Sequence, residues 1–230
     1  NDVFDKHKEE APELVALFLF GILLNNFGES KLLLPFIAKR FKDICLIENK
    51  LAGISSGKYL DIGQTILCVC GFIPWSNCKE NEEPILFNDV IKGQILPLRE
   101  SLLLNSRLNL VGFLHALSFS NLFLFTKNEF LSLIEDVLPF FLSDSNSEVR
   151  LASSSLLKMI VCIAYSDKQK LCSEKVEKLF QSAAKIKDKD EAKKQLFVAV
   201  AFACALIANV SISLTSCPDW LPPIFDHLES

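Results

Sequence analysis

Hydrophobic residues along the chain recur mainly at helical spacing, and breaker residues separate the apolar segments. In the first half, this spacing predicts helices at about 13–25, 30–47, 58–71, 85–104 and 106–119. A polar stretch over 73–84, rich in Glu and Asn and containing two prolines, predicts a loop. No strand pair and no glycine hairpin turn stand out in the sequence, so the predicted fold class is all-α.

The second half continues the same helical pattern. Its clearest helix start is the capping box Thr126-Lys-Asn-Glu129, in which the two side chains can satisfy each other's exposed amides. The helix that follows places Phe130, Ile134, Val137, Leu138 and Phe141 on one face. Two more apolar faces lie over 149–160 and 176–183. A dense charge run at 184–194 predicts a solvated loop or helix end before an apolar helix from Leu196, and a last helix begins at Asp219.

Leu-Pro pairs recur at comparable places in the helical segments, which suggests an internal repeat. Pro97 and Pro139 are 42 residues apart, and HEAT repeats have a period of about 40–47 residues with two helices per unit. Chance coincidence of prolines in a helical protein is the alternative. The four pairs are Leu34-Pro35, Leu96-Pro97, Leu138-Pro139 and Leu221-Pro222.

The unit around the third pair fits a HEAT-like pattern best. Pro139 lies near the end of an apolar helix, Asp144 begins a short turn, and Val149, Arg150 and Ala152 open a second helix. Each such helix pair buries one face within the unit and another against its neighbours. We therefore predict a HEAT-like α-solenoid of antiparallel helix pairs over the whole of 1–230, in which residues 1–104 match only as generic helical repeats.

Composition narrows the possible functions. The 230 residues carry 24 Lys and Arg against 28 Asp and Glu, a formal net charge of −4, and half of them are hydrophobic. Disorder requires low hydrophobicity and high net charge, and neither is present. A mildly acidic chain without a basic block has no electrostatic footprint for nucleic acid, so we expect no direct nucleic-acid partner.

Eight cysteines are spread along the chain, and most lie in apolar helical runs. Such cysteines behave as small buried hydrophobes, so we predict structural free thiols. Cys68, Cys70 and Cys78 form a faint metal-site alternative, but zinc favours a C-x2-C spacing and four ligands. We therefore expect no metal and no cofactor. The remaining cysteines are Cys45, Cys162, Cys172, Cys204 and Cys217.

The stretch 195–218 carries no charge and approaches the length of a membrane-spanning helix. Several polar residues dilute its second half, so a buried helix of a large helical protein is the favoured interpretation, and no membrane association is expected. The sequence shows no paired acids, nucleophile elbow or phosphate loop that indicates an enzyme. His115 and Trp220 fit packing roles better than chemical ones.

The segment from Arg107 onward resembles one known family. Arg107 opens an apolar helix that ends in an aromatic-x-Asn-x-Phe element, formed here by Phe119, Asn121 and Phe123. An acidic turn and Glu-Val-Arg follow at 144–150, and a Pro-x-Trp-hydrophobic-Pro element contains Trp220 and Pro222. In this order, the elements over 105–230 are similar to the C-terminal region of the giant single-chain HEAT-repeat proteasome activators.

This resemblance implies a role at the 20S proteasome. Members of the family form a helical dome on the α-ring, bias its gate towards opening, and promote ubiquitin-independent hydrolysis of peptides and some unfolded proteins. It implies a nuclear and cytoplasmic location, a link to DNA repair, and a bromodomain-like stretch at about 106–187 connected with acetylated histones. A generic HEAT scaffold or adaptor, unrelated to the proteasome, is the main alternative.

The end of the sequence adds one expectation. The segment 220–228 has the pattern of a unit's first helix with no partner after it, whereas solenoid ends need polar caps. We therefore expect a fragment of a longer solenoid, without the family's C-terminal hydrophobic-Tyr-x docking tail.

Overall fold

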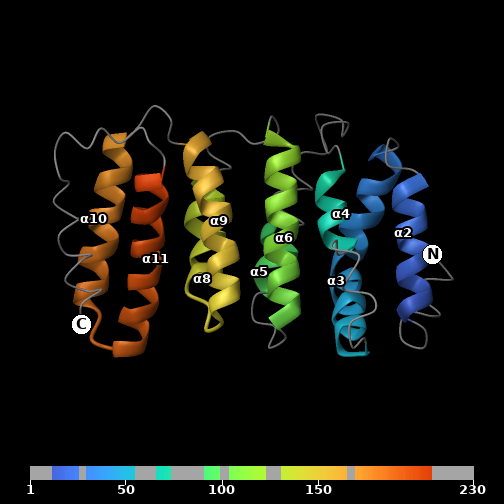
Figure 1. Cartoon of the computed structure of the whole chain (residues 1–230), viewed down its shortest axis with the longest axis horizontal. Helices are drawn as coiled ribbons and strands as arrows, with labels where there is room; N and C mark the ends of the chain where they lie inside the picture. Colours follow the sequence, from blue (N-terminus) through green and yellow to red (C-terminus); the bar gives the residue numbers. More distant parts are fainter. Residues whose placement is uncertain are drawn as a thin grey trace. The chain divides into compact units, whose positions relative to one another are not determined.

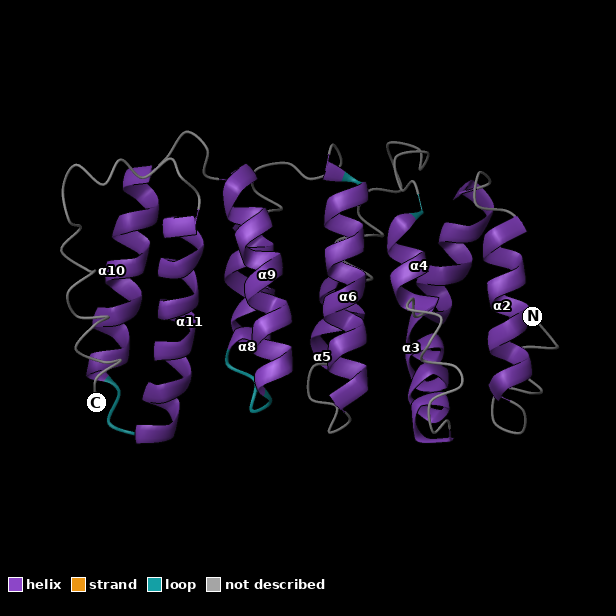
Figure 2. Ribbon diagram, in the orientation of Figure 1, coloured by secondary structure: helices purple, strands orange, loops and turns teal. Residues whose placement is uncertain are grey.

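The computed structural model describes residues 12–25, 30–54, 66–73, 91–98, 104–122, 131–164 and 169–208 (Figure 1). Within these ranges every regular element is a helix (Figure 2), which confirms the all-α prediction for the described part. The helices of the first half are α2 (Pro12–Asn25), α3 (Ser30–Ile54), α4 (Ile66–Phe72), α5 (Leu96–Leu98) and α6 (Leu104–Ser120). Those of the second half are η5 (Leu133–Val137), α8 (Leu138–Leu142), α9 (Ser147–Ala164), α10 (Gln169–Lys185) and α11 (Lys189–Ala208).

The chain divides into two compact units, Asn1–Glu129 and Phe130–Ser230. Helix α6 belongs to the first unit, although the family resemblance begins at about Arg107. The prediction of one repeat segment over 1–230 stays a prediction.

In the first unit, α6 packs against α3 and α4, and α2 packs against α3 and α4. Helix α2 buries Val15, Leu19 and Leu23, which are spaced four residues apart and so share one face. At the centre of the unit, the rings of Phe41 and Phe113 meet edge to face with centroids 5.0 Å apart.

Gly71 allows α4 and α6 to approach closely. A Cβ atom at this position would lie 2.8 Å from the Cβ of Ala116 and 2.8 Å from the carbonyl oxygen of Phe113. Both distances are shorter than van der Waals contact, so any larger residue would push the two helices apart.

In the second unit, α11 packs against α8, α9 and α10, and α8 also packs against α9. Helix α9 buries Val149, Leu156 and Ile160 as predicted. Ala152 is only half-buried, and Ser153 lies on the buried face beside Val149. The buried position thus lies one residue after the predicted one. The buried face of α9 also includes Leu157 and Val161, so it is wider than the single stripe that was predicted.

The helix predicted from Phe130 is not a regular α-helix. Residues Leu133–Val137 form a π-helical turn, and the backbone N–H of Leu138 donates to the carbonyl of Leu133, five residues earlier. The predicted face at Ile134, Val137, Leu138 and Phe141 is buried, and the wider turn also buries Leu133. Residue 130 lies outside the described residues.

A second π-helical turn spans residues 91–95, and it also leads directly into a Leu-Pro pair. Proline has no N–H, and its ring collides with the carbonyl four residues earlier in an α-helix. A wider turn just before proline relieves that collision. Pro35, by contrast, lies inside the uninterrupted helix α3, so the first Leu-Pro pair is structurally different from these two.

Two predicted boundaries change, the end of α3 and the start of α11. Helix α3 continues to Ile54 instead of ending near residue 47. Within the predicted segment 58–71, the described residues 66–71 are helical. Within the predicted segment 85–104, the described residues 91–98 and Leu104 are helical. Helix α11 begins at Lys189, seven residues before the predicted start, because Asp188 caps it: its Oδ1 accepts the N–H of Glu191 at 2.9 Å. The charge run is nevertheless mostly solvent-exposed, as predicted.

Several predicted features lie outside the described residues. They are most of the loop at 73–84, the capping box at 126–129, Phe123, Cys78, Cys217, Trp220, Pro222 and the last helix.

Candidate functional site

The helix–turn–helix formed by α8 and α9 contains five of the residues singled out from the sequence. Ser143 is the C-cap of α8: its backbone N–H donates to the carbonyl of Pro139 at 3.1 Å, and its hydroxyl donates to the same carbonyl at 2.7 Å. Asp144 Oδ1 then accepts the N–H of Asn146 at 2.8 Å, and Asn146 Oδ1 accepts the N–H of Glu148 at 2.8 Å. Asp144 thus shapes the turn, and Asn146 satisfies an exposed amide in the first turn of α9.

Arg150 closes this turn from the side of α9. Its Nη1 donates to the carbonyl of Asp144 at 2.7 Å and to the carbonyl of Ser145 at 2.9 Å. The guanidinium carbon also lies 4.7 Å from the centroid of the Phe197 ring on α11, within cation–π range. One side chain therefore joins the turn to a third helix.

Val149 and Ala152 complete this group. Val149 is fully buried, and the hydroxyl of Ser153 donates to its carbonyl at 2.6 Å. The structure thus brings Pro139, Asp144, Val149, Arg150 and Ala152 into one helix–turn–helix of the second unit.

Helix α10 contacts its neighbours through a lysine that was not singled out from the sequence. Lys175 forms an ion pair with Glu135, which lies in the π-helical turn. Its ammonium also lies 5.9 Å from the centroid of the Phe202 ring on α11. Lys175 therefore connects α10 to both η5 and α11.

The family-like residues of the first unit are spread along α6. Asn121 is fully buried, and its Nδ2 donates to the carbonyls of Gly71 and Ile73, each at 3.2 Å. Phe119 is 63% exposed. Arg107 lies fourteen residues before Asn121, roughly 20 Å along a helix, so the structure does not bring these two together. Asn121 acts here as a cap for the C-terminus of α4.

Glu48 is a buried acid that sequence reasoning missed. Only 6% of it is exposed, its Oε1 accepts the backbone N–H of Leu67 at 2.8 Å, and its Oε2 accepts Nδ2 of Asn109 at 2.7 Å. The sequence did contain a signal, because Glu48 continues the apolar helical face of Ile37 and Ile44 in α3. A carboxylate on such a face needs partners, and here α4 and α6 supply them.

Cysteine thiols surround this carboxylate. Burial first, and the charge of Glu48 second, raise the pKa values of Cys45 and Cys70 far above their ordinary range, and the same causes raise the pKa of Cys68. Thiolates are the reactive form of cysteine, so these thiols are held in the unreactive form at neutral pH. Cys45 and Cys70 are buried free thiols, as predicted.

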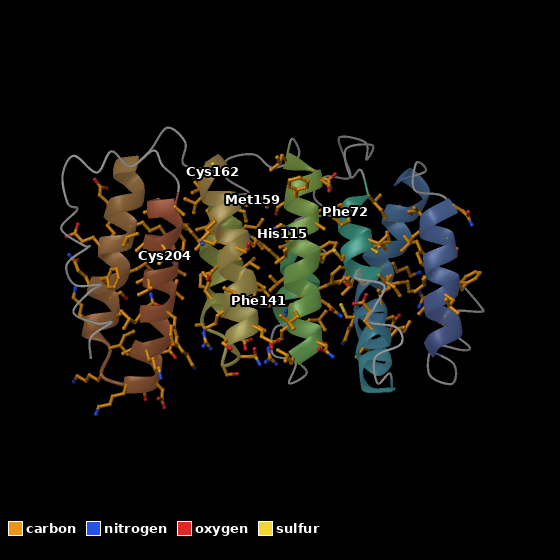
Figure 3. All side chains as sticks on the ribbon, in the orientation of Figure 1. Phe72, His115, Phe141, Met159, Cys162 and Cys204 are labelled. Atoms are coloured by element: carbon orange, nitrogen blue, oxygen red, sulfur yellow. The ribbon has the colours of Figure 1, made fainter. Side chains whose placement is uncertain are left out.

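The prediction of burial is wrong for Cys162 and Cys204, which are exposed on α9 and α11 (Figure 3). Cys162 follows the buried Val161 by one residue, which turns it about 100° away from the core. Cys204 shares an exposed stripe of α11 with Phe197. His115, which we expected in the core or at an interface, is half-buried on α6 (Figure 3).

In the part of the chain that the structure describes, no three His, Cys, Asp or Glu residues cluster closely enough to hold a metal ion. None of the described helices combines the length and the apolar character that spanning a membrane requires. No protein-family model, curated protein or solved structure matches the chain.

The contacts described above all perform the same kind of task. Arg150, Lys175, Asn121 and Glu48 each use a polar or charged side chain to fasten one helix to another or to close a turn. These side chains hold the helices in position.

Proposed function

We propose that this chain is a HEAT-like solenoid segment of antiparallel helix pairs, and that it forms part of the helical dome of a 20S proteasome activator. The observation that carries the proposal is the helix–turn–helix formed by α8 and α9. There Asp144 and Arg150 close the turn, and Val149 is buried behind it, at the positions where the sequence resembles the activator family.

The two π-helical turns support the repeat interpretation. Each occupies the five residues before a Leu-Pro pair, and the two prolines are separated by 42 residues, within the period of about 40–47 residues typical of HEAT units. An arginine follows each proline in the next helix, Arg107 in α6 and Arg150 in α9.

In this proposal the chain has a mechanical role. Its helix pairs would stack in the dome that the full-length protein places on the α-ring, where the dome biases the gate towards opening. The described polar contacts suit that role, because they fix the angle between successive helices without using exposed reactive groups. Binding of acetylated histones stays a prediction from the resemblance.

The test uses the full-length protein that carries this chain. Native-gel electrophoresis with 20S particles at physiological salt should show co-migration, and cleavage of a fluorogenic peptide should rise. The Val149→Asp variant should weaken both effects by disrupting one helix pair, whereas Leu151→Asp, at a position 74% exposed, should not. A wild-type protein that neither associates nor activates would favour the generic scaffold.

A further inference from the structure

Helix α4 is fastened at both ends by side chains from other helices. It has seven residues, and helices this short are unstable without tertiary contacts. Glu48 of α3 accepts the N–H of Leu67 in its first turn, and Asn121, just after α6, donates to the carbonyls of Gly71 and Ile73 at its other end. Docking of α4 therefore combines the burial of its apolar residues with a few identifiable hydrogen bonds at its two ends.

The bond at the N-terminal end requires an ionised acid. Both carboxylate oxygens of Glu48 act as acceptors, one for a backbone N–H and one for the Asn109 amide. An ionised carboxylate offers only acceptors, whereas the protonated acid carries an O–H donor on one oxygen. A proton must sit on one of these two oxygens, and an O–H oxygen is a poorer acceptor than a carboxylate oxygen, so protonation weakens at least one of the two bonds.

We propose that Glu48 is a pH-sensitive latch for α4: its ionised form holds the helix against α3 and α6, and its protonation releases the helix while the rest of the unit stays folded. The sign follows from the bonds, because docking uses the ionised form. Docking is therefore complete at neutral pH and is lost as the pH falls.

The other titratable groups near this carboxylate do not change that sign. Cys45 lies on α3 itself, and Cys68 and Cys70 lie on α4; all three thiols stay protonated from neutral to acidic pH because their pKa values are raised. Helix α6 contributes the neutral amide of Asn109. The other titratable or charged residues of the helices packed in this unit include Arg107 and His115 on α6 and Glu13 on α2.

The thiols provide the means to test the latch. Cys70 is fully buried on α4 and would become accessible when α4 leaves, whereas Cys162 is exposed on α9 and reports the intrinsic labelling rate. A dipyridyl disulfide labels protonated thiols in mild acid. Peptide mapping by mass spectrometry then gives the ratio of Cys70 to Cys162 labelling in the full chain.

As the pH is lowered from about 7 to about 4, the range that protonates glutamate, this ratio should rise about tenfold or more. It should do so before the helical circular dichroism signal falls. In Glu48→Gln, whose amide also presents a donor, the ratio should already be high at neutral pH and should no longer depend on pH. Glu148→Gln, an exposed matched control on α9, should behave as wild type.

Two results would overturn the latch. One is a ratio that stays low until the whole chain unfolds, and the other is wild-type behaviour of Glu48→Gln. If Glu48→Gln does not fold, Asn109→Ala decides the matter, because it keeps the acid and removes one of the two donors to its ionised form. Release should then begin at a higher pH than in wild type, and an unchanged release pH would refute the proposal.

Discussion

The guanidinium carbon of Arg150 lies 4.7 Å from the centroid of the Phe197 ring, which brings the turn between α8 and α9 into contact with α11. The same side chain donates to two carbonyls of its own turn. An arginine is suited to both tasks at once, because its planar group can stack on a ring while its edge donates hydrogen bonds.

Replacing Arg150 by alanine should therefore lower the free energy of unfolding by about 2–4 kcal/mol, the sum of a charge-assisted hydrogen bond and a partly exposed cation–π contact. Arg150→Lys should recover only part of this, since an ammonium cannot stack and bridge the carbonyls together. Urea unfolding measures the change. Lys178→Ala, at an exposed position of α10, is the control, and an equal loss in that variant would show that Arg150 has no special role.

Val149 and Leu151 offer a matched pair for the helix–turn–helix. Val149 is fully buried and Leu151 is 74% exposed, two residues later on the same helix. Val149→Asp should destabilise the unit by about 3 kcal/mol or more, because it buries an unpaired charge, and Leu151→Asp should cost about 0.5 kcal/mol or less. Thermal unfolding of both variants checks this, and similar melting temperatures would contradict the assignment of the buried face.

The features that the sequence predicted well are local ones. The turn at Asp144 and Arg150 follows from residues six positions apart, and the burial of Val149 follows from helical spacing. The early start of α11 was missed, although its capping residue Asp188 and the acid Glu191 stand in the sequence as a start signal.

The missed features depend on contacts between distant segments. Glu48 and Asn109 are 61 positions apart, and no local pattern shows that the two side chains meet. In the sequence Gly71 has the pattern of an ordinary helix end, and only its close contact with α6 shows why glycine is needed there. The π-helical turn at Leu133–Val137 departs from the period of 3.6 residues, so hydrophobic spacing at that period does not reveal it.

Gly71 and Gly112 should respond in opposite directions to the same substitution. A Cβ at Gly71 would collide with α6, whereas a Cβ at Gly112 meets no atom within 4 Å. Gly71→Ala should cost about 1–3 kcal/mol through overpacking, and Gly112→Ala should gain about 0.5–1 kcal/mol through better helix propensity. Urea unfolding of the two variants gives both signs, and a neutral Gly71→Ala would mean that α4 and α6 are less closely packed than described.

Substitutions at Asn121 test the hydrogen bonds at the C-terminal end of α4 separately from those at its N-terminal end. Asn121→Ala removes the amide that donates to the carbonyls of Gly71 and Ile73, and the loss of bonds to these buried groups should cost about 1–3 kcal/mol. Asn121→Asp should cost more at neutral pH, because its ionised carboxylate would face two carbonyl oxygens with no proton to donate.

The Asn121→Asp penalty should also shrink as the pH falls, because a protonated carboxyl regains one donor for these carbonyls. This pH dependence is opposite in sign to that expected from Glu48, whose bonds require the ionised form. Urea unfolding at pH 7 and at about pH 4.5, within the range where carboxyl groups begin to protonate, compares Asn121→Asp with Asn121→Ala. If the two variants lose stability equally at both pH values, the amide of Asn121 does not cap α4, and its burial alone explains its place in the unit.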